Sequence, residues 1–158
     1  MIQYEALADS IRALEPSAGS TRLICIDGRA GSGKTTCALA LQELLPQSSI
    51  IHMDDLYHGW TEDLDDSLAT RILEQIISPM LVGESSKYQR FNWFLNDFDD
   101  WVEISPSAIV ILEGVASSHP LIRQHASLSV WIEIDPELGA QRVLARDGEI
   151  SENHIENW

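Results

Sequence analysis

Residues 22–45 read RLICIDGRAGSGKTTCALALQELL, and this stretch decides the fold. A continuous apolar run is followed by a glycine-rich turn and then by a helical pattern that stops before Pro46. The turn, residues 28–35, fits the pattern G-x-x-x-x-G-K-[ST] at every position. Glycines let successive backbone N–H groups point at phosphate oxygens, and the N-terminus of the following helix adds its positive dipole. A strand, this turn and a helix in that order predict a phosphate-binding loop.

Different residues of the turn have different predicted roles in binding the nucleotide. We expect Lys34 to reach the β- and γ-phosphates of ATP and the Thr35 hydroxyl to ligate Mg²⁺. The chain has only two lysines, and one of them occupies this position. The residues predicted to contact the nucleotide are Gly28, Arg29, Ala30, Gly31, Ser32, Gly33, Lys34, Thr35 and Thr36.

The remaining apolar runs alternate with helical patterns. Strands are predicted at 23–26, 49–53, 108–113 and 128–134, and helices at 2–14, 34–45, 66–77 and after Pro136. This alternation is typical of βαβ units, so we expect a three-layer α/β/α P-loop NTPase fold with a mainly parallel sheet of four to five strands. Numbered along the chain, the expected strand order is 2-3-1-4. We expect Ser78-Pro79 to close the helix at 66–77, and residues 83–101 to be irregular.

Length and composition set the outer limits. The chain has 158 residues, 44% of them hydrophobic, which suits a single domain over 1–158 with a leading helix within 1–15. The net charge of −15 repels phosphate backbones and anionic lipids, so nucleic acid and membranes are not expected as partners. The N-terminus lacks the pattern of a signal peptide, and a cytoplasmic protein with reduced Cys25 and Cys37 is predicted.

Carboxylates stand where two predicted strands end. Asp54 and Asp55 follow the strand at 49–53, and Glu113 closes the strand at 108–113. Ligands of open α/β sheets bind beyond the carboxyl ends of the strands. Phosphoryl transfer needs a magnesium ligand and a base for the acceptor hydroxyl, so these residues are candidates for both. The alternatives are a helix cap or solvated turn for the aspartates and a salt bridge for Glu113. Asp135, before Pro136, is predicted to cap a helix.

Three blocks carry a resemblance to a known family. Residues 26–36 read IDGRAGSGKTT, residues 53–57 read MDDLY and residues 111–115 read ILEGV. In this order they resemble the uridine kinase-like group of P-loop kinases. The resemblance implies that Asp54 is the catalytic base, that Tyr57 helps to hold the acceptor and that Glu113 joins Thr35 at magnesium.

Two arginines complete the catalytic candidates. Arg142 and Arg146 are four residues apart and would lie on one helix face. The resemblance implies that they belong to a lid region at 136–150 that closes over the phosphates, where with Lys34 they would neutralise charge in the transition state. The alternative is that they are solvated and pair with Glu137 or Glu149.

The acceptor side departs from the nucleoside kinases, because the segment rich in aspartate and phenylalanine that follows their acceptor tyrosine is missing. In its place we expect Trp60 and Trp93 to join Asp54, Asp55 and Tyr57 in the acceptor pocket, the alternative being that the aromatic residues belong to the core. Relatives usually continue into a fifth strand beyond the lid, so a truncated chain or a reduced nucleotide site is a further expectation.

The function predicted is ATP-dependent transfer of the γ-phosphoryl group to a hydroxyl of a small metabolite, nucleoside-like in the leading interpretation. A sugar acid, dephospho-coenzyme A and an antibiotic remain alternative acceptors. A nucleotide-binding module that gates a partner protein is the alternative without catalysis. Monomer and homodimer are both open.

Overall fold

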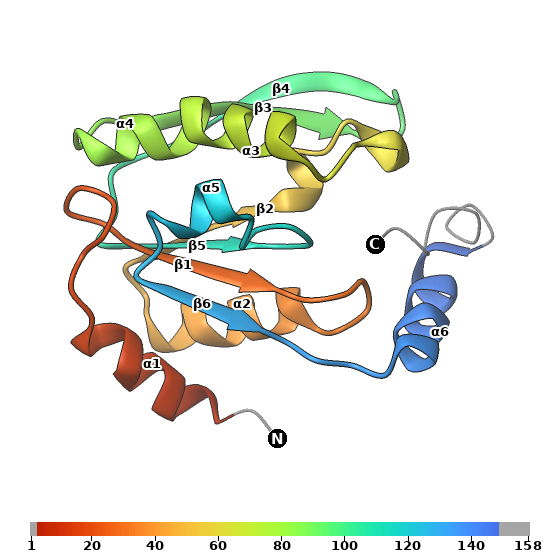
Figure 1. Cartoon of the computed structure of the whole chain (residues 1–158), viewed down its shortest axis with the longest axis horizontal. Helices are drawn as coiled ribbons and strands as arrows, with labels where there is room; N and C mark the ends of the chain where they lie inside the picture. Colours follow the sequence, from red (N-terminus) through yellow and green to blue (C-terminus); the bar gives the residue numbers. More distant parts are fainter. Residues whose placement is uncertain (1–2, 149–158) are drawn as a thin grey trace.

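The centre of the molecule is a parallel sheet of four strands (Figure 1). The computed structural model describes residues 3–148. The order across the sheet is β2-β5-β1-β6, which is the predicted order 2-3-1-4. The α/β fold class and a sheet of four strands are therefore confirmed. The strands are β1 (Arg22–Asp27), β2 (Ser48–His52), β5 (Ile109–Glu113) and β6 (Leu128–Trp131). Strand β6 ends three residues earlier than its predicted range of 128–134.

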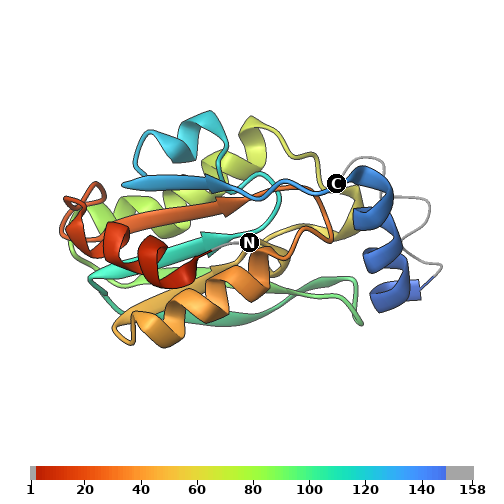
Figure 2. The same cartoon turned by 90° about the horizontal axis from the view of Figure 1, so that it is seen from below.

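Helices cover both faces of this sheet. Helices α1 (Tyr4–Ala13) and α2 (Lys34–Leu44) lie on one face, which Figure 2 presents toward the viewer. The opposite face carries α3 (Asp66–Ile72), α4 (Ser78–Leu81) and the short α5 (Pro120–Arg123). In β1, Ile24 and Ile26 pack toward α1 and α2, whereas Leu23 and Cys25 pack into the other core. Because alternate residues face opposite sides, a strand buried on both faces reads as a continuous apolar run.

The helix predicted at 66–77 runs further than expected. Its middle is a π-helical turn, η3 (Leu73–Ile77), in which the Ser78 N–H donates to the Leu73 carbonyl, five residues back. Helix α4 then continues to Leu81, so the prediction that Ser78-Pro79 ends the helix is wrong. Proline normally clashes with the carbonyl four residues before it, and the wider π turn relieves this crowding.

Residues 83–101 are ordered rather than irregular. They contain β3 (Ser86–Asn92) and the start of β4 (Asp97–Ile104), which pair as an antiparallel hairpin with a register shift between Gln89 and Phe91. That shift interrupts the alternation of apolar and polar residues by which a strand is recognised from sequence. The Asn92 side chain accepts hydrogen bonds from the N–H groups of Phe94 and Leu95, so the turn is built locally.

The last helix stands beyond the carboxyl ends of the strands. Helix α6 (Pro136–Asp147) lies at the right of Figure 1, separate from both helical layers. The Asp135 carboxylate accepts hydrogen bonds from the N–H groups of Glu137 and Leu138, which confirms the predicted cap. Residues 149 and 150 of the predicted lid lie outside the described residues. None of the helices between residues 3 and 148 has the length and apolar character that a bilayer span requires.

A buried carboxylate fastens the phosphate loop to the segment after β5. Asp27 ends β1, and its side chain accepts hydrogen bonds from the backbone N–H groups of Gly28 at 2.7 Å, Ala116 at 3.1 Å and Ser118 at 2.9 Å. Backbone donors away from water need such partners. Asp27 therefore joins two turns that are about ninety residues apart in the sequence.

Replacing this carboxylate should destabilise the fold. In Asp27→Asn the amide NH₂ cannot accept from the Ser118 N–H, so we expect the free energy of unfolding to fall by about 1–3 kcal/mol. Urea denaturation would measure it. Asp9→Asn is the matched control, because Asp9 is an exposed surface residue paired with Arg12. Equal stability of the two variants would contradict this role of Asp27.

Candidate active site

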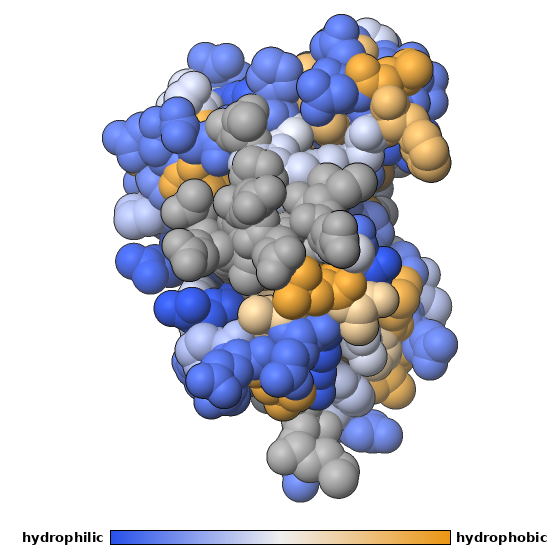
Figure 3. All heavy atoms as spheres, turned by 90° about the vertical axis from the view of Figure 1, so that its right-hand side faces the viewer, coloured by the Kyte–Doolittle hydropathy of each residue, from blue (hydrophilic) through white to orange (hydrophobic). Residues whose placement is uncertain are grey.

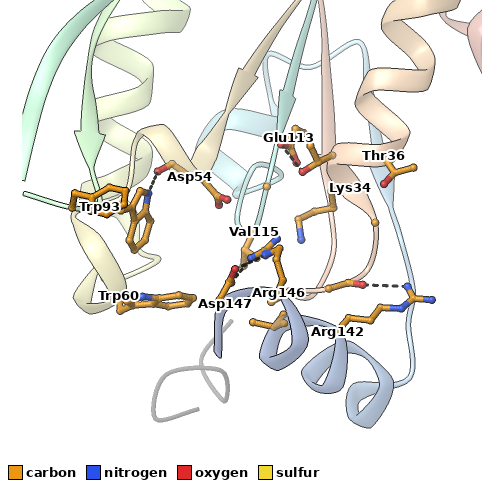
Figure 4. Close-up of a pocket in the computed structure, with 17 residues that line it drawn as sticks. Lys34, Thr36, Asp54, Trp60, Trp93, Glu113, Val115, Arg142, Arg146 and Asp147 are labelled. Atoms are coloured by element: carbon orange, nitrogen blue, oxygen red, sulfur yellow. Dashed lines mark hydrogen bonds and ion pairs between the residues drawn. The ribbon is translucent and has the colours of Figure 1, made fainter. Parts of the chain in front are cut away.

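A cleft of about 960 Å³ opens at the carboxyl edge of the central sheet (Figure 4). Its walls come from the phosphate loop with the start of α2, from the short helices η1 (Met53–Asp55) and η2 (Gly59–Thr61), from the hairpin tip, from the end of β5 and from α6. Small-molecule sites in open parallel sheets lie at this edge, and their volumes are roughly 300–1,000 Å³. Both position and size fit a ligand site.

The phosphate loop supplies one side of the cleft. Gly33 directly precedes α2 and has φ +95°, a left-handed conformation in which any side chain would be strained. Arg29 is exposed and does not line the cleft, and neither do Gly28 and Ser32. The predicted nucleotide-binding residues that line it are Ala30, Gly31, Gly33, Lys34, Thr35 and Thr36.

Lys34 is folded back onto its own loop. Its Nζ donates to the carbonyl oxygens of Gly28 and Arg29, each at 2.9 Å. Burial lowers the pKa of Lys34 below its ordinary value of 10.5, while the carboxylates of Glu113 and Asp54 oppose that shift. The ammonium group thus sits at the base of the cleft, where phosphate oxygens could replace the two carbonyls.

Glu113 is the buried acid of the site. Its Oε1 accepts from the Thr35 hydroxyl at 3.0 Å and lies 2.6 Å from Nδ1 of His52. The sheet register explains the meeting, because His52 and Glu113 are direct partners on β2 and β5. His52 was missed by sequence reasoning. The sequence showed that His52 stands at the end of a predicted strand, but its pairing with Glu113 is known only from the register of the sheet.

Thr35 and Glu113 suit one magnesium ion. Both offer oxygen ligands, and their contact brings these oxygens to a single point. In residues 3–148 no group of three or more His, Cys, Asp or Glu side chains is arranged to hold a metal. Magnesium usually binds one or two protein oxygens together with substrate phosphates and water. The donor set is therefore of the kind that would hold magnesium once a nucleotide is bound.

The two arginines that were predicted to belong to a lid lie on α6 at the open side of the cleft. Nη1 of Arg142 donates to the Gly31 carbonyl at 3.3 Å. Arg146 makes two hydrogen bonds with the Asp147 carboxylate, at 2.7 and 2.6 Å. These partners are Gly31 and Asp147, whereas the alternative had named Glu137 and Glu149. Glu149 lies outside the described residues. Both arginines line the cleft, so the structure brings them to the same site as Lys34.

Backbone contact sets the distance between α6 and the phosphate loop. A Cβ atom at Gly31 would collide with the Gly139 carbonyl, and one at Gly139 would lie 2.9 Å from the Ala30 carbonyl. Only glycine at both positions allows this approach. The contact places Arg142 and Arg146 above the loop.

Asp54 faces the cleft from η1, and Asp55 does not line it. Surrounding protein raises the pKa of Asp54 above its ordinary value of 3.8, and the nearby Glu113 carboxylate raises it further. The side chain still keeps a water-accessible surface in the cleft. Asp54 is therefore open to a ligand, whereas Asp55 is turned elsewhere.

Aromatic side chains form the far side of the cleft. We call Trp60, Trp93 and Phe94 the aromatic wall. The rings of Trp60 and Trp93 meet edge to face with centroids 5.5 Å apart, and the indole N–H of Trp93 donates to the Asp54 carbonyl at 3.1 Å. Phe94 was not predicted; it is fully exposed on the hairpin tip. Figure 3, which views the molecule from the cleft end, shows apolar side chains exposed at the upper corner, where the hairpin lies.

Tyr57 requires a correction. It was expected to contact the acceptor, but its ring is fully buried in the core and does not line the cleft. Its hydroxyl donates to the Val115 carbonyl at 2.7 Å. Because a buried hydroxyl needs such a partner, Tyr57 supports the cleft from beneath.

A curated protein named as a kinase is similar to this chain in sequence. The curated uridine kinase of Borrelia hermsii (strain HS1 / DAH) is 26% identical over 158 aligned positions, which cover 87% of this chain and 74% of that protein. No family model matches the chain.

Two solved structures share the fold. A Bacillus stearothermophilus protein provisionally identified as a uridine kinase has a TM-score of 0.68 at 22% identity, covering 97% of this chain and 90% of that chain. A Silicibacter sp. TM1040 protein provisionally identified as a fructose transport system kinase has a TM-score of 0.70 at 18% identity, covering 99% and 92%. The predicted resemblance to the uridine kinase-like group is confirmed.

The contact between His52 and Glu113 predicts a pH dependence of stability. The hydrogen bond to Glu113 raises the pKa of His52 above 6.5, although burial opposes the shift. Protonated His52 therefore stabilises the folded state below its unfolded pKa, and this contribution is lost as the pH rises through the higher folded pKa.

Thermal melts of the nucleotide-free protein in a chelator should show this loss above pH ~6.5. The profile of His52→Gln should be flatter over the same range, and Glu113→Gln, which removes the partner, should behave alike. An unchanged profile in both variants would contradict the assignment.

Proposed function

We propose that this chain is an ATP-dependent kinase that transfers the γ-phosphoryl group to a hydroxyl of a small, uncharged, ring-containing metabolite, with a nucleoside as the leading candidate. One observation carries the proposal: a single cleft has the phosphate loop on one side, the aromatic wall on the other and Asp54 between them (Figure 4). The kinase names of the similar proteins support the same chemistry.

Each side chain has a task in this proposal. Lys34, Arg142 and Arg146 would neutralise the phosphate oxygens during transfer, and Asp54 would accept the proton of the acceptor hydroxyl. Magnesium, held by Thr35 and Glu113, would supply further charge neutralisation on the phosphates. Closure of α6 over the cleft would exclude water and so limit hydrolysis of ATP.

The charge distribution favours an uncharged acceptor. Every lysine or arginine among the described residues lining the cleft comes from α2 or α6. The side formed by η1, η2 and the hairpin contributes Asp54 and the aromatic wall. An anionic acceptor such as a sugar acid or dephospho-coenzyme A would meet an aspartate and no cation there. Flat indole faces, by contrast, suit a base or sugar ring.

A non-catalytic switch module is the weaker alternative. Such a module needs the phosphate loop and magnesium, but it has no use for a carboxylate between the nucleotide and an aromatic wall. The position of Asp54 therefore favours an enzyme.

Removing the charge of Asp54 is the sharpest test of catalysis. Asp54→Asn keeps the shape of the side chain, so phosphoryl transfer should fall by about 10²–10⁴-fold while the affinity for MgATP stays nearly unchanged. Asp55→Asn is the matched control and should cost much less. Lys34→Ala should show the opposite pattern, with weakened nucleotide binding. If Asp55→Asn abolishes transfer and Asp54→Asn does not, the base has been assigned to the wrong aspartate.

An acceptor screen tests the substrate class. Nucleosides, neutral sugars, gluconate and dephospho-coenzyme A would each be incubated with MgATP and the products identified by mass spectrometry. We expect transfer to a nucleoside and none to the two anions. A preference for an anion would refute the charge argument, and no transfer to any small molecule would favour the switch module.

A further inference from the structure

The segment that carries Trp60 is held by one guanidinium group. Arg71, on α3, uses Nη2 to donate to the Leu56 carbonyl at 2.5 Å and to Oε2 of Glu62 at 2.9 Å. The same Glu62 oxygen accepts from the backbone N–H of His58 at 2.6 Å. These two contacts lie at the two ends of residues 56–62, the segment that contains η2 and Trp60. Arg71 and Glu62 thus close the segment at both ends.

This ion pair is sheltered from water. The side chains of Arg71 and Glu62 are 30% and 8% exposed, whereas those of the surface pair Arg12 and Asp9 are 50% and 75% exposed. Exposed pairs contribute little, but loss of one partner of a sheltered pair leaves the other charge poorly solvated. Breaking this pair should therefore displace the segment rather than leave it in place.

The guanidinium group also contacts the hairpin. Its carbon lies 5.5 Å from the ring centroid of Phe98 on β4, within the range of a cation–π contact. Phe98 meets His58 and Phe91, with centroids 5.5 and 5.4 Å apart. Phe91 in turn meets Trp93 edge to face at 5.2 Å. One arginine thus touches both structures that deliver the aromatic wall.

These contacts continue to the proposed base, since Trp93 donates to the Asp54 carbonyl. Neither Arg71 nor Glu62 lines the cleft, so neither would touch substrate. We infer that Arg71 and Glu62 are positioning residues that hold Trp60, Trp93 and Asp54 in the arrangement that binds the acceptor. The inference concerns how the side of the cleft formed by η1, η2 and the hairpin is held in place. Its kinetic test rests on the proposed function.

The first test is kinetic, with uridine as the probe acceptor. In Arg71→Gln and Glu62→Gln the KM for uridine should rise about 10- to 100-fold, the cost of a small misplacement, while the KM for MgATP stays within about twofold. Arg71→Lys keeps the charge and should recover part of the loss. Arg90→Gln is the matched control, because Arg90 pairs with Asp100 on the exposed part of the same hairpin. A rise in both KM values, or an equal effect in the control, would overturn the inference.

The second test does not depend on catalysis. The contact between Trp60 and Trp93 should give a near-ultraviolet circular dichroism signal, identified as the part lost in Trp93→Phe. Arg71→Gln and Glu62→Gln should lose that signal while far-ultraviolet spectra remain native, and Arg90→Gln should keep it. If Arg71→Gln fails to fold, Glu62→Gln still decides, because its amide oxygen can accept from the His58 N–H.

The two tests separate the two claims. Loss of the tryptophan signal without any transfer to uridine by the wild-type protein would refute a uridine acceptor but retain the positioning role. An intact signal in folded Arg71→Gln and Glu62→Gln would refute the positioning role, whatever the acceptor.

Discussion

The site depends on the register of three parallel strands. Hydrogen bonding pairs Ile26 of β1 with Glu113 of β5, and Glu113 with His52 of β2. This alignment puts the buried carboxylate of Glu113, on β5, between the end of the strand that leads into the phosphate loop and the end of the strand that leads to Asp54. A shift of one residue would turn every side chain of a strand to the other face of the sheet. The apolar residues on both faces therefore fix the register, and the register brings Thr35, Glu113 and His52 together.

The two halves of the cleft are built in different ways. The phosphate half relies on backbone geometry, on glycines and on a helix N-terminus, which are local features. The half proposed to bind the acceptor relies on side chains from a hairpin and a short segment that meet only in the folded chain, with Trp60 against Trp93 as the clearest case. This difference is consistent with the proposed division of the cleft, because function resides in sites placed on a common scaffold.

The same difference explains what could be predicted from sequence. The phosphate loop, the four strands and the Asp135 cap follow from periodicity and short motifs, which are local, and the strand order was expected from the fold class that these features indicate. The hairpin was missed because its register shift breaks the alternation of residues. The burial of Tyr57 and the partner of His52 were missed because both depend on residues about sixty positions away, Val115 and Glu113. Nothing in a single sequence indicates such pairings.

The backbone contact between Gly31 and Gly139 restricts how this protein can change over generations. Neither position has a side chain that could be shortened to make room for the other, so a substitution at one glycine cannot be compensated by a substitution at the other. Substitution is therefore disfavoured at both positions, which lie more than a hundred residues apart in the sequence. In an alignment of descendants, Gly139 would look as invariant as the phosphate loop itself, although what selection preserves there is clearance between two backbones and not a chemical group.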